Sequence, residues 1–196
     1  MGGDAKGLPS NLPQLVHLRS WCEGALLCDG SPAGAAFATA QHHAFTFLLI
    51  DGPRYSLRGA CAIVENPAVF GRIDHLGIPI DLVIYGAGRV SKRLLQWLGE
   101  MKTDFKLLHL PDYDPVGLSE FERLRASLGT RVTLHVPTDL AERFRRYSNR
   151  ALLQNSKSRG LLERLRKSSD ASVRTVVRLI ENENAGLEQE ALFLSI

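Results

Sequence analysis

The sequence predicts an α/β fold, a Rossmann-like four-stranded parallel sheet with flanking helices and a helical C-terminal extension. Three observations support this prediction. Four short, almost wholly apolar runs have the length and composition of buried strands. Segments with helical spacing of apolar residues separate these runs, which is typical of parallel strands joined by right-handed crossovers. After the fourth run, the apolar spacing stays helical toward the end of the 196-residue chain.

The N-terminal quarter has weaker patterns. Residues 1–13 are rich in Gly, Pro and Asn, and they predict a flexible lead. Apolar residues at helical spacing allow a helix over Gln14–Leu27, and Asp29–Gly34 predicts a turn. The apolar run His42–Ile50 leaves its type of structure open and closes at Asp51–Pro53.

The middle of the chain is regular. The predicted strands are Ala60–Val64, Leu82–Tyr85, Phe105–Leu110 and Arg131–Val136. The predicted helices between them start at Asn66-Pro67 and stop at Gly77, span Val90–Leu98 before Gly99, and span Ser119–Leu128 before Gly129. Beyond Thr138 we expect helices, with one apolar stripe over Val173–Ile180 and another apolar face over Leu187–Leu194.

Composition excludes several classes of protein. With 44% hydrophobic residues the chain is not mainly disordered. Its longest apolar run, Ala44–Ile50, is far shorter than the ~18 residues of a membrane span, so we expect no membrane partner. The N-terminus has no apolar core of a secretory signal. Three cysteines without metal-ligand spacing indicate reduced thiols and a cytoplasmic protein.

Charge is unevenly distributed. From Glu142 to Arg178 there are eleven basic and three acidic residues, a balance of +8, whereas the whole chain carries +3. A basic segment beside an acidic body predicts contact with a polyanion, and nucleic acid fits best. Few aromatic residues accompany the segment, so backbone contact is expected rather than base stacking. The alternative is a solvated helix face. The candidate contacts are Arg143, Arg145, Arg146, Arg150, Lys157 and Arg159.

Carboxylates follow two of the predicted strands. Glu65 comes directly after the first strand, and Asp112 and Asp114 follow the third. Ligands of parallel sheets bind beyond the carboxyl ends of the strands, so these side chains converge if the two strands are neighbours. Converging carboxylates repel each other without a cation, and oxygen ligands suit Mg²⁺ or Mn²⁺. Such a site fits metal-dependent hydrolysis of phosphodiesters. The alternative is a polar turn shaped by Asp and Pro.

These motifs resemble a known family. Glu65 in CAIVEN, the glycine turn after the second strand and the DYDPVG motif of residues 112–117 resemble the Toprim domain of primases, topoisomerases and several nucleases. The family pattern is a Glu after the first strand and an Asp-x-Asp after the third, usually followed by Gly. The resemblance covers residues 58–137.

One branch is more similar than the others. IVEN, DYDPVG and GLEQEA (residues 186–191) resemble the nuclease subunit (JetD, or MksG) of SMC-like Wadjet plasmid-defence complexes, itself similar to the topoisomerase VI A subunit. The resemblance implies Mg²⁺-dependent cleavage of double-stranded plasmid DNA, a homodimer, partnership with an SMC-like condensin ATPase complex and a place at the bacterial nucleoid. By position, Glu65, Asp112 and Asp114 would be metal ligands, and Glu190 would assist catalysis.

On this resemblance the chain divides into three parts. Residues 1–56 would be an N-terminal lead or partial extension, 57–140 the Toprim catalytic core and 141–196 a basic helical extension packed on the core. Family members have a long N-terminal DNA-binding arm, whereas only about fifty residues precede the first predicted strand here. We therefore expect a fragment or a short relative that borrows its arm.

The nucleophile also departs from the topoisomerase-like members, which use a tyrosine from that arm. The four tyrosines of this chain do not lie in a matching context, so attack by a metal-activated water is predicted. They are Tyr55, Tyr85, Tyr113 and Tyr147.

Two other functions compete with a nuclease. The run Gly86-x-Gly88-x-x-Ser91 between a strand and a helix resembles a dinucleotide fingerprint, with Asp112 near the distance of the ribose-binding acid. Two points count against this cofactor site. Ser91 stands where the fingerprint has its third glycine, and a dinucleotide site leaves Glu65, in the preceding strand–helix unit, unexplained. A plain tight turn before the helix is a further alternative. The second competitor is an assembly module that cuts only within its complex, or not at all. Among six histidines without metal-ligand spacing, His109 could reach the carboxylates, although a core histidine is the default.

Overall fold

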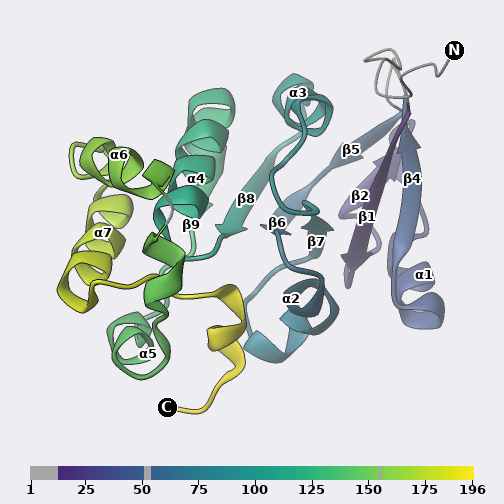
Figure 1. The fold of residues 1–196 in the computed structure, drawn as a ribbon. Coiled ribbons are helices and arrows are strands. Elements are labelled where there is room, and N and C mark those ends of the chain that lie inside the picture. Colours follow the sequence, from purple (N-terminus) through teal and green to yellow (C-terminus); the bar gives the residue numbers. More distant parts are fainter. Residues whose placement is uncertain (1–12, 51–53, 155) are drawn as a thin grey trace, which may run out of the picture.

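A six-stranded sheet forms the centre of the molecule (Figure 1). The computed structural model describes residues 13–50, 54–154 and 156–196. The strand order is β4-β1-β7-β6-β8-β9. Strands β7, β6, β8 and β9 are parallel, and β1 and β4 extend the sheet antiparallel at one edge. The strands are β1 Gln14–Ser20, β4 Phe45–Leu49, β6 Gly59–Val64, β7 Leu82–Tyr85, β8 Phe105–Leu110 and β9 Val132–Leu134.

Helices cover both faces of this sheet. Figure 1 shows α3 and α4 on one side of the parallel strands and α2 on the other. The helices are α1 Ala35–His42, α2 Pro67–Arg72, α3 Lys92–Glu100, α4 Pro115–Leu128, α5 Leu140–Tyr147, α6 Ser156–Leu165 and α7 Ala171–Glu183. Short 3₁₀ helices are η2 Ile73–Leu76, η3 Gly129–Arg131, η4 Arg150–Leu153 and η5 Gln189–Phe193. A small second sheet contains β3 Ser31–Pro32, β2 Leu26–Cys28 and β5 Tyr55–Leu57.

The predicted α/β class and its parallel strands are confirmed. Strands β7 and β8 have the predicted bounds, and β6 begins one residue earlier. From Cys61 to Val64 every side chain of β6 is buried, as expected for a strand covered on both faces. The first crossover helix also starts as predicted, because the Asn66 side chain accepts a hydrogen bond from the amide of Ala68, 2.7 Å away.

The predicted helix over Gln14–Leu27 is wrong. Residues 14–20 form β1, which lies between β4 and β7, and Leu26–Cys28 form β2. Val16 and Leu18 alternate into the core, a two-residue period that the helical spacing concealed. Arg19 is also buried, and its guanidinium donates to the carbonyls of Phe70 and Gly71 and to Asp74.

The predicted four-stranded sheet therefore omitted two strands, β1 and β4, which extend the parallel sheet in the antiparallel direction. The open run His42–Ile50 contains the end of α1 and strand β4. The turn within Asp29–Gly34 is confirmed at Asp29 and Gly30, both of which have positive φ angles. Residues 1–12 and 51–53, the predicted lead and loop closure, lie outside the described residues.

Several boundaries differ from the predictions. Helix α3 starts at Lys92 rather than Val90, because the Ser91 side chain caps it, and it continues through Gly99. Helix α4 starts at Pro115 rather than Ser119, because Asp114 is its N-cap. Strand β9 is shorter than predicted, since residues 129–131 form a 3₁₀ turn.

The C-terminal part is helical up to Glu183. Helix α7 buries the predicted stripe, which consists of Val173, Val176, Val177 and Ile180. The following segment contains only the short η5 rather than an α-helix over Leu187–Leu194. It runs back to the sheet beside α2 and α5. No helix among the described residues is long and apolar enough to cross a membrane.

Candidate functional site

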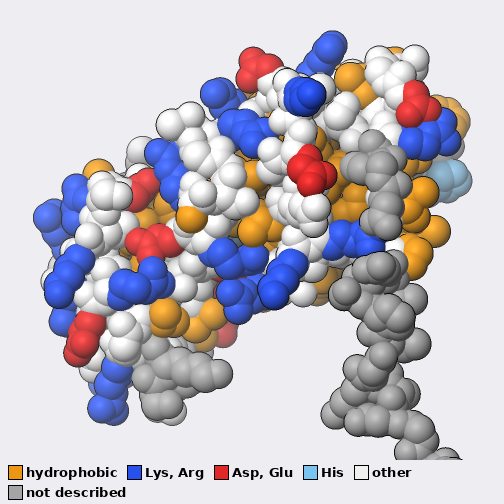
Figure 2. Space-filling view, turned by 90° about the horizontal axis from the view of Figure 1, so that it is seen from above, with side chains coloured by type: hydrophobic (Ala, Val, Ile, Leu, Met, Phe, Trp, Pro, Cys, Tyr) orange, Lys and Arg blue, Asp and Glu red, His pale blue; other side chains and the backbone are white. Residues whose placement is uncertain are grey.

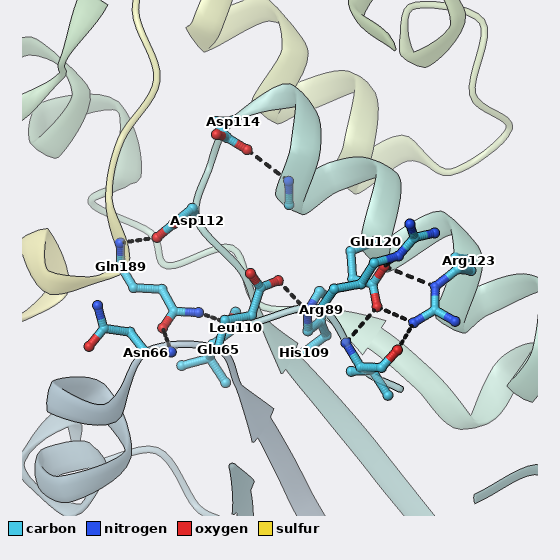
Figure 3. A network of polar contacts seen from close by, with 12 residues as sticks. Glu65, Asn66, Arg89, His109, Leu110, Asp112, Asp114, Glu120, Arg123 and Gln189 are labelled. Carbon is cyan, nitrogen blue, oxygen red and sulfur yellow. Dashed lines mark hydrogen bonds and ion pairs between the residues drawn. The ribbon is translucent and has the colours of Figure 1, made fainter. Parts of the chain in front are cut away.

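The site begins where β6 and β8 end. These two strands are adjacent and parallel, and their pairing runs to Val64 opposite Leu110. Glu65 follows the last pair directly, and Asp112 lies two residues beyond it on the other strand. The condition for convergence of the carboxylates, neighbouring first and third predicted strands, is therefore met. Figure 3 shows Glu65 and Asp112 at this edge of the sheet.

Glu65 is held close to a buried histidine. Its Oε1 lies 3.5 Å from Nε2 of His109, whose ring is fully buried and stacks on Phe121. Glu65 Oε1 and both ring nitrogens of His109 are buried without a hydrogen-bond partner. Buried polar atoms without a partner are rare in native proteins, and a bound ion or water is one explanation for them.

Asp112 and Asp114 have different environments. The Oδ1 atom of Asp112 accepts a hydrogen bond of 2.8 Å from the backbone amide of Gln189. Burial, together with the smaller effects of the charges of Asp114, Glu65 and Glu190, raises the pKa of Asp112 to about 6, although the hydrogen bond from Gln189 lowers it. Asp114 turns its Oδ1 to the amide of Gly117, 2.7 Å away, and caps α4 (Figure 3). Burial raises the pKa of Asp114 too.

The C-terminal segment brings Glu190 to the same place. The Oε1 atom of Glu190 accepts a hydrogen bond from the Asn66 side chain, and its Oε2 is buried without a partner. The charge of Glu190 acts on Asp112. We call Glu65, Asp112, Asp114 and Glu190 the carboxylate cluster.

Backbone contacts anchor the C-terminal segment to the Asp-x-Asp loop. The amide of Tyr113 donates to the carbonyl of Leu187 at 2.7 Å, and the amide of Leu187 donates back at 3.1 Å. Asn149 and Gly186 exchange a second such pair of hydrogen bonds. The loop itself needs Gly117, because a Cβ there would lie 2.2 Å from the carbonyl oxygen of Asp112. The loop and the segment therefore form one tightly packed unit.

The glycine loop, residues 86–91, uses its polar groups within the fold. The amide of Gly86 donates to the carbonyl of Val64 at 2.7 Å, and the amide of Gly88 donates to that of Glu65 at 3.1 Å. The amide of Val90 donates to Glu120 Oε1 at 3.1 Å. A dinucleotide site needs such amides free for phosphate, so this geometry disfavours the cofactor alternative. The loop supports the backbone of Glu65 instead.

Glu120 is a second buried carboxylate, and it is fully engaged. Besides the amide of Val90, it accepts from Arg123 Nε at 2.9 Å and from Arg89 Nε at 3.2 Å. Figure 3 shows this group beside His109. It ties α4 to the glycine loop.

The predicted nucleic-acid contacts separate into three kinds. The guanidinium of Arg143 binds Asp139 and the carbonyls of Ala191 and Leu194, and only 12% of its side chain is exposed. Arg145 and Arg146 are exposed, but both form ion pairs with Glu142.

Arg150 and Arg159 are exposed, and within the described part of the chain no ion pair involves either of them. They line a cavity of about 450 Å³ with Leu153, Gln154, Ser158, Leu162 and Asn184. The side chain of Lys157 lies outside the described residues. Figure 2 shows many Lys and Arg side chains over the side of the molecule that carries α4, α6 and α7, and more hydrophobic side chains toward β1 and β4.

The comparison with protein families matches most of the chain. Residues 54–195 match the family described as Wadjet protein JetD, C-terminal. The chain belongs to this JetD family. No curated protein matches it. The matched range contains every member of the carboxylate cluster, the glycine loop and the basic residues discussed above.

Two residues that contact the candidate site were not predicted. Gln189 is fully buried between the strand ends, and Glu120 holds the glycine loop. Gln189 lies in the GLEQEA motif, but the motif gave it no role, and its contact with Leu110 spans 79 positions; the contact of Glu120 with Val90 spans 30 positions. For His109 the default prediction was a core residue, and the alternative was a residue that reaches the carboxylates. Its ring is buried, and its Nε2 also lies 3.5 Å from Glu65 Oε1.

The donors fit a hard divalent cation. They are oxygens, and those of Glu65 and Glu190 include buried atoms without partners. In the described ranges, no group of three His, Cys, Asp or Glu side chains is arranged so that it could hold a metal ion. Mg²⁺ does not require three such side chains, because it is commonly held by one or two carboxylates, with waters and substrate phosphates as its other ligands.

Proposed function

We propose that this chain is a Mg²⁺- or Mn²⁺-dependent DNA endonuclease with a Toprim-like site that hydrolyses phosphodiester bonds in double-stranded plasmid DNA. Membership of the JetD family supports a role in Wadjet defence. The observation that carries the reaction is the carboxylate cluster, where buried oxygens of Glu65 and Glu190 have no partner beside an Asp112 carboxyl whose pKa is raised to about 6. A divalent cation would offset the repulsion between the negative charges of these carboxylates.

Each residue of the cluster has a role in this proposal. Glu65 and Asp112 would hold the cation, and Asp114 would keep the loop in place through its cap of α4. A bound Mg²⁺ or Mn²⁺ stabilises charge on the phosphate and lowers the pKa of water. Glu190 Oε2 would accept the proton of the attacking water, whose oxygen forms the new bond to phosphorus. The bond from phosphorus to the leaving oxygen breaks, and that oxygen takes up a proton.

A tyrosine nucleophile is less compatible with the geometry. Tyr113 lies between the two aspartates, but it is fully buried, and burial raises the pKa of its phenol. The hydroxyl of Tyr147 donates to the carbonyl of Ser195. Hydrolysis by water therefore remains the proposed route.

The basic surface supports contact with the DNA backbone. Arg150 and Arg159 line their cavity without a carboxylate beside them, and η4 lies next to the Asp-x-Asp loop, because a Cβ on Gly186 would touch both Leu152 and Asp114 at 3.0 Å. Phosphates bound there would lie on the side of the molecule that carries the cluster. We further propose a homodimer that works with an SMC-like condensin ATPase complex at the nucleoid in the cytoplasm. Family membership supports these partners.

Cleavage of supercoiled plasmid tests the proposal. The purified chain is incubated with plasmid and Mg²⁺ or Mn²⁺, with EDTA as the metal-free control and Asp112→Ala as the variant. We expect metal-dependent nicking or linearisation that the variant loses while it stays folded by circular dichroism. Cleavage by a folded Asp112→Ala protein at the wild-type rate would contradict the assignment.

An assembly module is the second candidate, and one observation favours it. Asp114 is turned to its helix cap rather than to Asp112, so the cluster is not a complete ligand set by itself. In that case the chain binds Mn²⁺ but cuts plasmid only when the partner complex is added. The same assay with and without that complex separates the two candidates.

A further inference from the structure

Gln189 lies at the centre of the site and joins its parts. Its side chain is 0% exposed. The side-chain amide donates to the carbonyl of Leu110, and its oxygen accepts from the amide of Asn66 at 3.4 Å. The backbone amide of Gln189 donates to Asp112. One residue therefore contacts the chain after β6, the end of β8 and a member of the carboxylate cluster.

The position of these contacts matters because the sheet ends there. Strands β6 and β8 are paired up to Val64 and Leu110. Glu65 and Asp112 lie beyond this last pair, in the two segments that follow the strands. The Gln189 side chain bridges the two chains after the last ladder pair (Figure 3). It thereby limits how far the two carboxylates can move apart.

Gln189 can do this because its own backbone is anchored. Leu187, two residues earlier, is joined to Tyr113 by two backbone hydrogen bonds. Glu190, one residue later, is held by the Asn66 side chain. A buried amide with fixed neighbours on both sides has little freedom to change its geometry.

We propose that Gln189 is a positioning residue that sets the separation of Glu65 and Asp112 for a divalent cation. The inference rests on the proposed metal site and deepens it, because it gives the C-terminal segment a part in metal binding. Residues that orient metal ligands through hydrogen bonds commonly change metal affinity by about 10–100-fold when they are replaced.

The test is the affinity of the protein for Mn²⁺ alone, measured from the paramagnetic resonance signal of the free ion. Gln189→Met keeps the length of the side chain and removes both its donor and its acceptor. We expect the Kd for Mn²⁺ to rise at least about tenfold. Gln189→Asn, which keeps the amide but is one methylene too short for the bridge, is expected to behave in the same way and serves if the first variant does not fold.

Val177→Ala is the matched control. It removes buried apolar volume from α7, so it lowers the melting temperature without touching the cluster, and its Kd is expected to stay within about twofold of wild type. A merely structural Gln189 would give the same result as this control. An unchanged Kd in both Gln189 variants would overturn the proposal.

A second measurement needs no metal. Hydrogen exchange of the amide at position 189, which donates to Asp112, is followed by NMR in the metal-free protein. If the side chain positions the loop, this amide exchanges at least about tenfold faster in Gln189→Met and not in Val177→Ala. Unchanged exchange would contradict the positioning role. If the wild-type protein binds no Mn²⁺, the metal site fails by itself, and the exchange result still decides the role of Gln189.

Discussion

The glycine loop and the carboxylate cluster lie at the same edge of the sheet, but their buried polar groups differ. In the glycine loop, the amides of Gly86, Gly88 and Val90 all have acceptors within the protein. Glu120, the carboxylate of this region, accepts from that loop and from two arginines. These polar groups are satisfied within the protein.

The carboxylate cluster is incomplete. Buried oxygens of Glu65 and Glu190 have no hydrogen-bond partner among the described residues, and neither have the ring nitrogens of His109, whose Nε2 lies 3.5 Å from Glu65 Oε1. The comparison separates two kinds of polar cluster that look alike in sequence. The satisfied polar groups of the glycine loop hold the fold together, whereas the partnerless atoms of the carboxylate cluster are those that the proposed cation would complete.

The largest expected effect on stability comes from the loop that carries Asp112. In Gly117→Ala, the new methyl would lie 2.2 Å from the carbonyl oxygen of Asp112, and the loop must shift. We expect a loss of about 3 kcal/mol in the free energy of unfolding, measured by urea denaturation.

Gly86→Ala in the glycine loop is the matched control. Its methyl would meet the carbonyl oxygen of Val64 at 3.2 Å, so the loss should be smaller, about 1 kcal/mol. The comparison breaks down if both variants lose the same stability.

The second prediction separates stability from metal binding. Glu120→Gln removes the charge that two arginines and the amide of Val90 use. We expect it to lose about 2 kcal/mol of stability and to keep the wild-type affinity for Mn²⁺ within about twofold. Loss of Mn²⁺ binding in Glu120→Gln would contradict the account, because it would place the cation at the glycine loop.

The third prediction uses the pH dependence of stability in EDTA. The pKa of Asp112 is raised by burial from 3.8 to about 6, so its charged form destabilises the metal-free fold above pH 6. This destabilisation disappears as the pH falls from 6 toward 4. We expect Asp112→Asn to be more stable than wild type at pH 8, by the order of 1–2 kcal/mol, with the difference vanishing near pH 4. A difference that does not change with pH would contradict the raised pKa.

The smallest expected effects are on DNA binding. Charge reversal of Arg150 and Arg159 should weaken binding of double-stranded DNA about tenfold and lower the salt slope by about two. Charge reversal of Arg145 and Arg146 should have less effect, because Glu142 already neutralises part of their charge. Arg58→Glu, at the amino end of β6, is the control. An unchanged salt slope in the first pair would make this surface a solvated face.

The parallel strands could be predicted because burial on both faces leaves a continuous apolar run. The antiparallel strands β1 and β4 could not, since exposed apolar residues such as Leu15 and Leu48 interrupt their two-residue alternation and mimic a helical or undefined pattern. Glu65 and Asp112 were predictable because each lies within two residues of the end of a recognisable strand. Their adjacency depended on the sheet order, which only the structure provides.

The rest of the site depends on contacts between distant segments. Gln189 meets Leu110 because the chain returns past α7, and no local pattern encodes that return. Arg143 shows that the sequence can also suggest a function that the fold takes up. It belongs to the basic run predicted to contact DNA, but its guanidinium binds Asp139 and two carbonyls of the C-terminal segment. The proposed division of the chain at residues 56 and 140 stays a prediction.

The most direct test of the comparison is to locate a cation by anomalous X-ray scattering from crystals soaked in Mn²⁺. The account predicts one strong peak between Glu65 and Asp112, with carboxylate oxygens about 2.0–2.2 Å from it. The peak should be absent in crystals of Asp112→Asn. A peak at the glycine loop, or none near the carboxylate cluster at saturating Mn²⁺, would contradict the account.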